Sequence, residues 1–290
     1  MATIRKVEKK DKEQILEISS KIWEGNDFIP KVFDKWIEEK VGEFTAIEEE
    51  GKVVAFSKLN DFGNNVGWLE GLRVHEDYRG KGYAKLITEY YMEKAKKEGY
   101  EKLHLAIYKG EGRKHLIEDY DFHTILKLKY YDTVEKKNFE TNKKIVLAKE
   151  EDSLYDYVIN SKEYNEYKGF FNFDWSFKHI NEKLINQLLK REEIFILKEN
   201  NEIKGMIILS SYNNKENSLA VSFISGEDHY EDLLKFAFNK FSEKTDNKSI
   251  LLMCPENLIF IKKKAKELGF KCFNQLNSDV WLLEHKVTKK

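Results

Sequence analysis

The chain has 290 residues, and at about 150 residues per domain this length predicts two domains. Fifty Lys+Arg against 51 Asp+Glu give a formal net charge of -1, and no run of five basic residues occurs. A nucleic-acid partner is therefore not expected, because such proteins carry a basic excess or block. The 41% hydrophobic and 13% aromatic fractions exclude a disordered composition for most of the chain.

Several classes of cofactor and location are also disfavoured. The two cysteines, Cys254 and Cys272, are too few for a disulfide framework, so we expect a reducing, cytoplasmic compartment. No apolar run reaches the ~18 residues of a membrane span, and the first ten residues lack the apolar region of a signal peptide. We therefore expect no membrane partner. The seven histidines show no zinc-binding spacing, so we expect no metal.

Hydrophobic periodicity in the first half predicts strands and helices in mixed order. The predicted strands are 3–7, 44–48, 52–59, 66–74, 103–108, 122–131 and 143–148. The predicted helices are 12–23, 30–40, 81–98 and 113–120. Pro30 suits a helix start and Gly99 a helix end, and Glu50-Gly51 is a hairpin turn.

The second half repeats this order. The predicted helices are 151–167, 181–191, 230–241 and 257–268, and the predicted strands are 194–197, 203–209, 219–224, 250–254 and 279–283. The turn and strand at 51–55 match 201–205 at an offset of 150, and Phe122 matches Phe270 at 148. A steady offset favours two copies of one α/β unit over two unrelated α/β domains.

The segment 71–84, Gly-Leu-Arg-Val-His-Glu-Asp-Tyr-Arg-Gly-Lys-Gly-Tyr-Ala, carries the most chemical information. A strand ends at Val74, and Arg79-Gly80-Lys81-Gly82 then opens a helix. Unpaired amides and the positive end of the helix dipole make such a start an anion site. Taken alone, the tetrapeptide is more often a basic surface helix start, and it is neither a Walker A nor a Gly-x-Gly-x-x-Gly motif.

In its context, Arg79-x-x-Gly82-x-Ala84 resembles the Arg/Gln-x-x-Gly-x-Gly/Ala signature of the GNAT acyltransferases. The likeness covers about residues 3–148, and element order extends it to the second half. It implies two tandem GNAT-like α/β (α+β) folds, 1–149 and 150–290, each a mixed, mostly antiparallel sheet flanked by helices. It also implies that acetyl-CoA is the cosubstrate. The family then assigns the pyrophosphate to the loop Arg79, Gly80, Lys81, Gly82, Tyr83 and Ala84, and the pantetheine arm to the backbone of Leu72, Arg73 and Val74.

A narrower likeness concerns the acceptor. The run 26–30 with Trp36, followed by Glu-Gly-Leu-Arg-Val at 70–74, is similar to a branch that includes histidine α-N-acetyltransferases. The implied reaction is acetyl transfer to a primary amine, and we expect an α-amine of an amino acid, small molecule or peptide.

The chain departs from the family motif after the fifth strand. The family's Asn, Ala, Tyr and Gly positions are occupied by Gly110, Arg113, Ile117 and Asp121. The usual tyrosine acid, which protonates the leaving thiolate, is therefore absent. Tyr120 lies three residues further, on the same helix face, and is either a substitute acid or a packing aromatic.

The second half departs differently. It keeps Asn257 and Gly269-Phe270, but its counterpart of the phosphate loop, 225–230, reads Ser-Gly-Glu-Asp-His-Tyr. Two carboxylates at that helix start would repel a pyrophosphate. We therefore expect that this copy is degenerate and does not bind coenzyme A.

Glu70 is the candidate general base. Counting by two along the strand places it with Trp68, Leu72 and Val74, and burial among apolar neighbours raises the pKa of a carboxylate, as a base needs. A bulge would reverse the count, and an ion pair with Arg73 is the alternative role. Other candidates, for which packing is the simpler role, are His75, His115, His123, Tyr130, Tyr131, Asp132, Asp27, Phe28 and Trp36.

We expect direct attack in a ternary complex, because neither cysteine lies in the first half. The alternative is a coenzyme-A-binding module without catalysis, which the missing tyrosine and asparagine favour. The sequence leaves the acceptor and the choice between monomer and homodimer open.

Overall fold

The computed structural model describes residues 2–108, 119–150, 152–211, 218–244 and 246–288. They form two compact α/β units. Unit 1 holds the described residues of 1–105, 114–123 and 283–290, and unit 2 holds those of 106–113 and 124–282. No helix among the described residues is long and apolar enough to cross a membrane.

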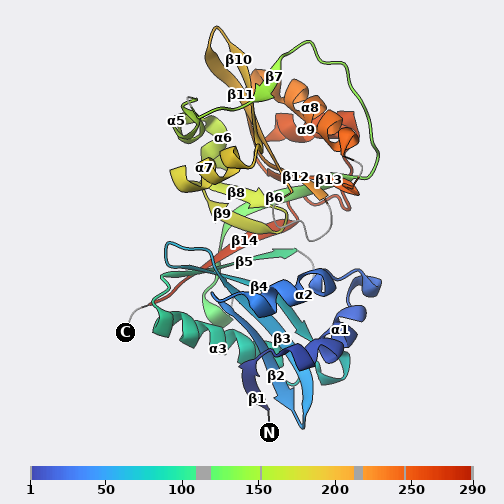
Figure 1. The fold of residues 1–290 in the computed structure, drawn as a ribbon, viewed down its shortest axis with the longest axis vertical. Helices are drawn as coiled ribbons and strands as arrows, with labels where there is room; N and C mark the ends of the chain where they lie inside the picture. The colour runs from blue at the N-terminus through green and yellow to red at the C-terminus, as the bar shows by residue number, and fades with distance from the viewer. Residues whose placement is uncertain (1, 109–118, 151, 212–217, 245, 289–290) are drawn as a thin grey trace. The chain divides into compact units, whose positions relative to one another are not determined.

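Unit 1 is a sheet with helices on both faces (Figure 1). Its elements in chain order are β1 (Thr3–Lys6), η1 (Lys9–Asp11), α1 (Lys12–Ser20), η2 (Trp23–Gly25), α2 (Ile29–Glu38), β2 (Glu43–Glu49), β3 (Lys52–Asp61), β4 (Val66–Val74), η3 (Glu76–Tyr78), α3 (Tyr83–Glu98) and the start of β5 (Lys102–Tyr108). The strand order is β1-β2-β3-β4-β5-β14, in which β4 and β5 are parallel.

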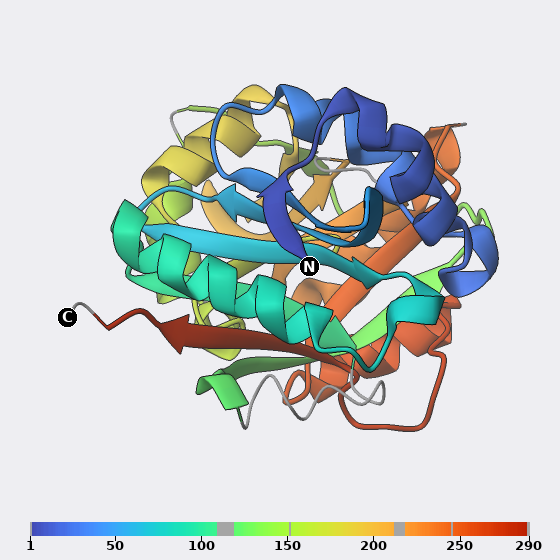
Figure 2. The same cartoon turned by 90° about the horizontal axis from the view of Figure 1, so that it is seen from below.

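Alternation along β2 divides the side chains of unit 1 between the two faces of the sheet. Phe44 and Ala46 join the apolar side chains of α1 and α2 in one buried cluster. Glu43, on the opposite face, accepts a hydrogen bond from the Tyr90 hydroxyl of α3 at 2.6 Å. Figure 2 shows α3 on one side of these strands and the α1–α2 pair on the other.

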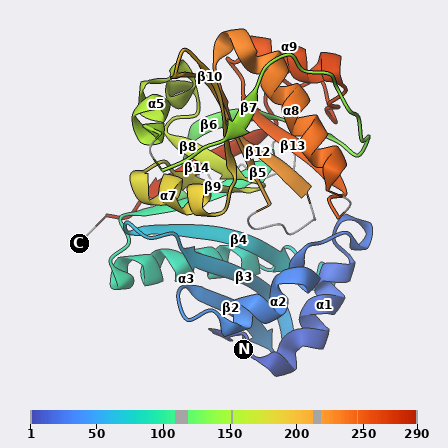
Figure 3. The same ribbon diagram turned by 45° about the horizontal axis from the view of Figure 1, so that its top comes forward.

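Unit 2 repeats this plan. Its elements are β6 (His123–Thr133), β7 (Ile145–Leu147), α5 (Leu154–Asn160), α6 (Lys162–Glu166), β8 (Phe170–Phe173), β9 (Ser176–His179), α7 (Glu182–Lys190), β10 (Ile194–Glu199), β11 (Glu202–Ser210), β12 (Ser218–Ser225), η4 (Glu227–His229), α8 (Tyr230–Glu243), β13 (Ser249–Pro255), α9 (Ile259–Leu268) and the start of β14 (Val280–Lys286). The strand order is β7-β10-β11-β12-β13-β6, and β12 and β13 are the parallel pair. Figure 3 shows α8 and α9 on one side of these strands and α5 and α7 on the other.

The two units exchange their last strands. β6, which follows the first copy in sequence, pairs antiparallel with β13 in unit 2, and β14, which follows the second copy, ends in unit 1 beside β5. β7 likewise pairs with β10. The compact units therefore do not follow a single division at 149/150, and that division stays a prediction about the two sequence copies.

Most predicted elements are confirmed within a few residues, with two differences. The hairpin β8–β9 was not predicted, and the helix predicted over 151–167 is two helices, α5 and α6, separated at Ser161. Ser161 is extended there, and its hydroxyl caps α6 by accepting from the Tyr164 amide. The predicted helix 113–120 lies mostly outside the described residues.

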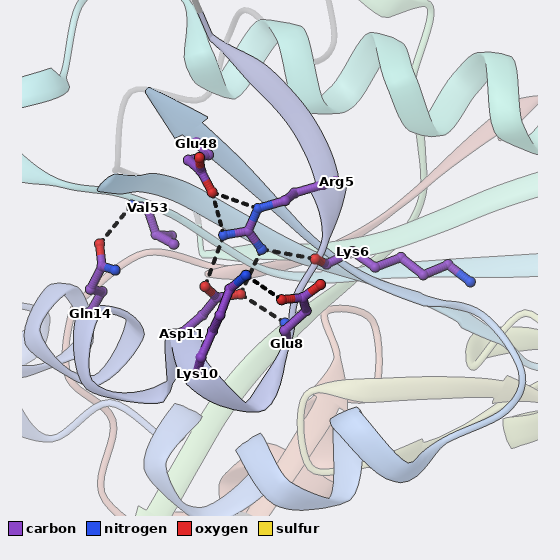
Figure 4. A network of polar contacts seen from close by, with 8 residues as sticks. All are labelled: Arg5, Lys6, Glu8, Lys10, Asp11, Gln14, Glu48 and Val53. Carbon is purple, nitrogen blue, oxygen red and sulfur yellow. Dashed lines mark hydrogen bonds and ion pairs between the residues drawn. The ribbon is translucent and has the colours of Figure 1, made fainter. Parts of the chain in front are cut away.

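One polar network fixes the start of the chain to the sheet (Figure 4). The Arg5 guanidinium on β1 donates to both carboxylate oxygens of Asp11, at 2.7 and 2.8 Å, and to Glu48 of β2 at 2.7 Å. Burial would raise the pKa of Asp11, but hydrogen bonds from Arg5 and from the Glu8 amide outweigh it and lower that pKa. The network thus joins β1, the start of α1 and β2.

Replacement of this buried carboxylate should weaken the fold in a pH-dependent way. Asp11→Asn should lower the free energy of unfolding at pH 7 by about 1.5–3 kcal/mol, the range for hydrogen bonds to charged groups. Because the folded pKa is lowered, the Asp11 contribution should be complete above an unfolded pKa of about 3.9 and should fade as the pH falls below it. Denaturant unfolding at pH 7 and pH 3 measures both effects.

Asp34→Asn is the matched control. Asp34 also pairs with a basic residue, Lys12 at 2.7 Å, but 69% of its side chain is exposed. Its loss should cost less than about 1 kcal/mol. Equal destabilisation by both variants would contradict the role given to Asp11.

Candidate active site

The loop before α3 presents unpaired backbone amides. Gly82 is the N-cap of α3 with φ 86°, a left-handed conformation that glycine adopts without strain. Among the residues that the structure describes, the amides from Gly80 to Lys85 donate no hydrogen bond to other protein groups. The first turn of a 16-residue helix therefore offers its amides and its positive dipole end to an anion.

Aromatic contacts hold this loop in place. The Lys81 ammonium lies 4.4 Å from the ring centroid of Tyr78, which in turn contacts His75 edge-on. The Tyr83 hydroxyl donates to Glu49 of β2 at 2.7 Å, and this hydrogen bond raises the pKa of Tyr83 to about 12. Arg79 and Ala84, like the two glycines, are exposed. All six predicted loop residues thus lie in one segment, anchored through Tyr83.

A bulge interrupts β4 just before this loop. Lys58 of β3 pairs with Glu70 and Phe56 pairs with Arg73, so Gly71 and Leu72 together oppose Ser57. Gly71 has φ 68°, and a Cβ there would lie 2.8 Å from the Trp36 ring. Only glycine meets both requirements without strain, so the bulge and the packing of Trp36 depend on the same residue.

The bulge overturns the predicted surroundings of Glu70. Since Arg73 and Phe56 lie on the α1–α2 face, Glu70 shares that face with Trp68 but not with Leu72 or Val74, which turn toward α3. Glu70 is half-buried, and its carboxylate accepts a hydrogen bond from the Asn60 amide at 2.7 Å. Its surroundings are therefore polar as well as apolar.

Arg73 has a partner other than the predicted one. Its guanidinium donates to both oxygens of Asp27, at 2.8 and 3.0 Å, and lies 4.7 Å from the Trp23 ring centroid and 5.6 Å from that of Phe28. This pair fixes the turn between α1 and α2 to β4. Asp27 and Trp36 are buried, and Phe28 contacts the ring of Trp36 edge-on at 6.0 Å, so the three pack beside β4.

β4 also has a free edge in the region assigned to pantetheine. Its parallel pairing with β5 joins only 66–68 to 102–104. From Leu69 to Val74, the edge away from β3 has no strand partner among the described residues. The side chains of Arg73 and Arg79 contact the carbonyls of Leu72 and Val74 at 3.0 and 3.5 Å.

The Tyr120 hydroxyl is buried, and the Glu89 carboxylate lies near it. Burial, with the nearby carboxylates of Glu89 and Asp119, raises the pKa of Tyr120 to about 12, which keeps the hydroxyl protonated at neutral pH. The Tyr120 carbonyl accepts from His285 Nδ1 at 2.8 Å. A protonated phenol is the form that can act as an acid.

The remaining candidates are spread over the fold. His75 caps η3, and His123 lies 3.6 Å from Glu284 with half of its side chain exposed. Tyr130, Tyr131 and Asp132 belong to unit 2, and His115 lies outside the described residues. Among the residues described, no group of three or more His, Cys, Asp or Glu side chains is arranged to hold a metal ion.

One amide of the corresponding loop in unit 2 has a buried carboxylate as its partner. The Gly226 amide donates to the buried carboxylate of Glu163 at 3.1 Å, and the Tyr230 hydroxyl donates to the same oxygen. Glu163 therefore places a buried carboxylate against this loop, and its negative charge would repel a pyrophosphate. Sequence reasoning noted the acidic Glu227 and Asp228 here but missed Glu163, which comes from α6, more than 60 residues earlier.

Residues 12–120, which contain this loop and β4, match the model of the Acetyltransferase (GNAT) family. Over this segment the chain is similar to the GNAT acetyltransferase family. The predicted likeness is thus confirmed for this segment, and a likeness to this family implies the use of acetyl-CoA. An 87-residue stretch is 31% identical to a histidine N-acetyltransferase from Scomber australasicus, a match that covers 30% of this chain and 26% of that protein.

Solved structures extend the likeness to the whole chain. A GCN5-related N-acetyltransferase from Sphaerobacter thermophilus aligns with a TM-score of 0.67 at 11% identity, over 99% of this chain and 96% of that one. A tandem GNAT protein from the clavulanic acid biosynthesis pathway aligns with a TM-score of 0.60 at 10% identity, over both complete chains. At these identities the alignments show the fold, and they confirm the predicted tandem GNAT architecture.

A carboxylate in the GNAT loop should weaken donor binding. Gly82→Glu puts a negative charge beside the free amides, so calorimetry should show an affinity for coenzyme A reduced more than tenfold, or over about 1.4 kcal/mol. Gly82→Asn tolerates the left-handed backbone without the charge and should lose less. Gly99→Glu, at the other end of α3 and also left-handed, should bind like the wild type. Wild-type affinity in folded Gly82→Glu would contradict the assignment.

The contrast between the two loops predicts stoichiometry. Because Glu163 already accepts the Gly226 amide, calorimetry should give one coenzyme A per chain. The Gly82→Glu variant should then show no second, unaffected site. Two equivalent sites in the wild type would refute the proposed difference between the copies.

Proposed function

We propose that the protein transfers an acetyl group from acetyl-CoA to the α-amine of an amino acid or of a small amine-bearing molecule. The observation that carries this proposal is the row of free amides before α3, next to the free edge of β4. Exposed Arg79 and Lys81 add positive charge, so the loop suits a pyrophosphate. The donor supplies an activated acetyl group.

The residues of unit 1 have distinct roles in this reaction. The acceptor nitrogen bonds to the acetyl carbon while the carbon–sulfur bond breaks. The proton lost by the nitrogen goes to the Glu70 carboxylate, directly or through water. The departing sulfur takes a proton from Tyr120 or from solvent. Asn60 holds the Glu70 carboxylate by its 2.7 Å hydrogen bond, so the base has a defined orientation.

The chemistry of the amine favours an α-amino acceptor. At pH 7 roughly one lysine side chain in 2,500 is neutral, whereas roughly 10% of α-amines are neutral. General-base catalysis contributes typically about 10²–10⁴-fold, so an α-amine needs less from the protein than a lysine does. The 31% identity to a histidine N-acetyltransferase supports the same class of acceptor.

A coenzyme-A-binding module without catalysis is the second candidate. The observation that favours it is the sequence itself, which has Ile117 where the family has its tyrosine acid. Amine-dependent release of the free thiol separates the two functions, because only the enzyme produces it.

An acceptor screen tests the proposed reaction. Thiol release with free amino acids, polyamines, aminoglycosides and lysine peptides should be fastest with α-amines. Glu70→Gln should lower kcat/KM by about 10²-fold or more, because a general base is lost. Glu38→Gln, an exposed glutamate on α2, is the matched control and should keep wild-type activity. Activity confined to lysine side chains or aminoglycosides, or full activity in Glu70→Gln from pH 6 to 9, would contradict the proposal.

A further inference from the structure

A tyrosine and a glutamate tie the start of α3 to the sheet of unit 1. Tyr83 is the first residue of α3 and is buried. Its hydroxyl donates to a carboxylate oxygen of Glu49, the last residue of β2, at 2.7 Å. A hydrogen bond to a carboxylate is stronger than one between neutral groups. The Tyr83–Glu49 pair therefore holds the first turn of the helix against the strand.

The same tyrosine contacts the other end of the donor loop, residues 79–82. The ring of Tyr78, which ends η3, lies 6.3 Å from the Tyr83 ring, so the two rings meet across the loop. Gly80 and Gly82 of the loop are left-handed, and a Cβ at either would meet no atom of the described residues within 4 Å. Packing therefore does not fix the backbone at these glycines, and the contacts on either side of the loop must order it.

Unit 2 keeps the tyrosine but supplies a different carboxylate. Tyr230 is the first residue of α8, and its hydroxyl donates to Glu163 of α6, which also accepts the Gly226 amide. η4 ends at His229 and α8 begins at the next residue, so unit 2 has no counterpart of the four residues between η3 and α3. A tyrosine–glutamate pair at the helix start is thus common to both copies. Unit 1 combines it with a loop whose amides donate to no protein group among the described residues.

The charge of Glu49 opposes the function of this loop. A carboxylate near free amides disfavours a pyrophosphate, so electrostatics alone would favour a neutral residue here. The exposed side chains of Arg79 and Lys81 offset this charge, and the Lys81 ammonium lies 4.4 Å from the Tyr78 ring centroid. What a carboxylate adds at this position is the hydrogen bond that it accepts from Tyr83.

We propose that Glu49 and the side chain of Tyr83 are positioning residues for donor binding. With the Tyr78 ring, they hold the donor loop in the conformation that presents its amides to the pyrophosphate of acetyl-CoA. The inference rests on the proposed function, since it takes this loop as the donor site. A loop that is already ordered loses less conformational entropy when the ligand binds, so affinity rises without a new contact to the ligand. Glu49 thus acts through the loop backbone and not by touching the donor.

Calorimetric titration with coenzyme A separates the hydrogen bond of Glu49 from its charge. Tyr83→Phe and Glu49→Ala each break the pair and should raise the Kd about three- to tenfold, as expected when one or two side chains must be ordered on binding. Glu49→Gln removes the same charge as Glu49→Ala, but its amide oxygen can still accept from Tyr83. This conservative variant should therefore restore the wild-type Kd or lower it. A purely electrostatic Glu49 would instead give tighter binding in both Glu49 variants.

Two further comparisons distinguish positioning from general destabilisation. The double variant Glu49→Ala/Tyr83→Phe should bind about as well as either single variant, because both changes break one hydrogen bond. Glu50→Ala, the matched control, removes an exposed carboxylate at the next position and should not weaken binding. In thiol release, Tyr83→Phe and Glu49→Ala should raise the KM for acetyl-CoA and leave kcat within about twofold.

Failure of this inference and failure of the proposed function give different results. If the wild type binds coenzyme A and Tyr83→Phe and Glu49→Ala bind it equally tightly, the pair has no positioning role and the proposed function stands. If the wild type binds coenzyme A but releases no thiol, the reaction is refuted and the titrations still test the pair. A wild type that does not bind coenzyme A would overturn both. Tyr83→Phe keeps the ring, so it tests the pair even if thermal unfolding shows that Glu49→Ala does not fold.

Discussion

The bulge at Gly71 is the constraint on which the candidate site depends. It inserts one residue into β4 and so changes which side chains face α1 and α2. Before the bulge, Glu70 faces the helix pair; after it, Arg73 does, although three positions separate them. The same bulge admits the Trp36 ring against the strand. Without it, either Glu70 or Arg73 would lie on the α3 face, and the ion pair with Asp27 could not form together with the present position of Glu70.

The two copies share one backbone arrangement but differ in the charges around the loop before the central helix. Each has an antiparallel hairpin, a bulge, a parallel strand pair and a helix after the bulged strand. In unit 1 the amides before the helix are unpaired. In unit 2 the carboxylate of Glu163 accepts the Gly226 amide of the corresponding loop, and Glu227 and Asp228 add negative charge. The two loops thus differ in the sign of the charged side chains beside them.

The sequence was informative where a signal is local. Periodicity located α3, and the glycines and basic residues located its N-terminal loop, because both depend on neighbours in the chain. The bulge in β4 was considered only as an alternative to a regular strand, since the alternation of apolar and polar residues cannot show where an extra residue is inserted. The hairpin β8–β9 was missed because Phe170–Phe173 is buried on both faces and shows no alternation. The burial of Lys58 gave no signal either, because a lysine is normally exposed.

The exchange of last strands could not be predicted from the sequence either, because strands that pair over a long distance in the chain share no local sequence pattern. This exchange has a consequence for how the protein folds during synthesis. Unit 1 includes residues from 283 onward, so its sheet lacks its sixth strand until β14 has been synthesised, long after β1–β5. Until then, the edge of β5 is an unpaired template for wrong partners. Contacts this distant in sequence also form slowly. Unit 1 is translated first, but its sheet should become complete only after most of unit 2 has been made.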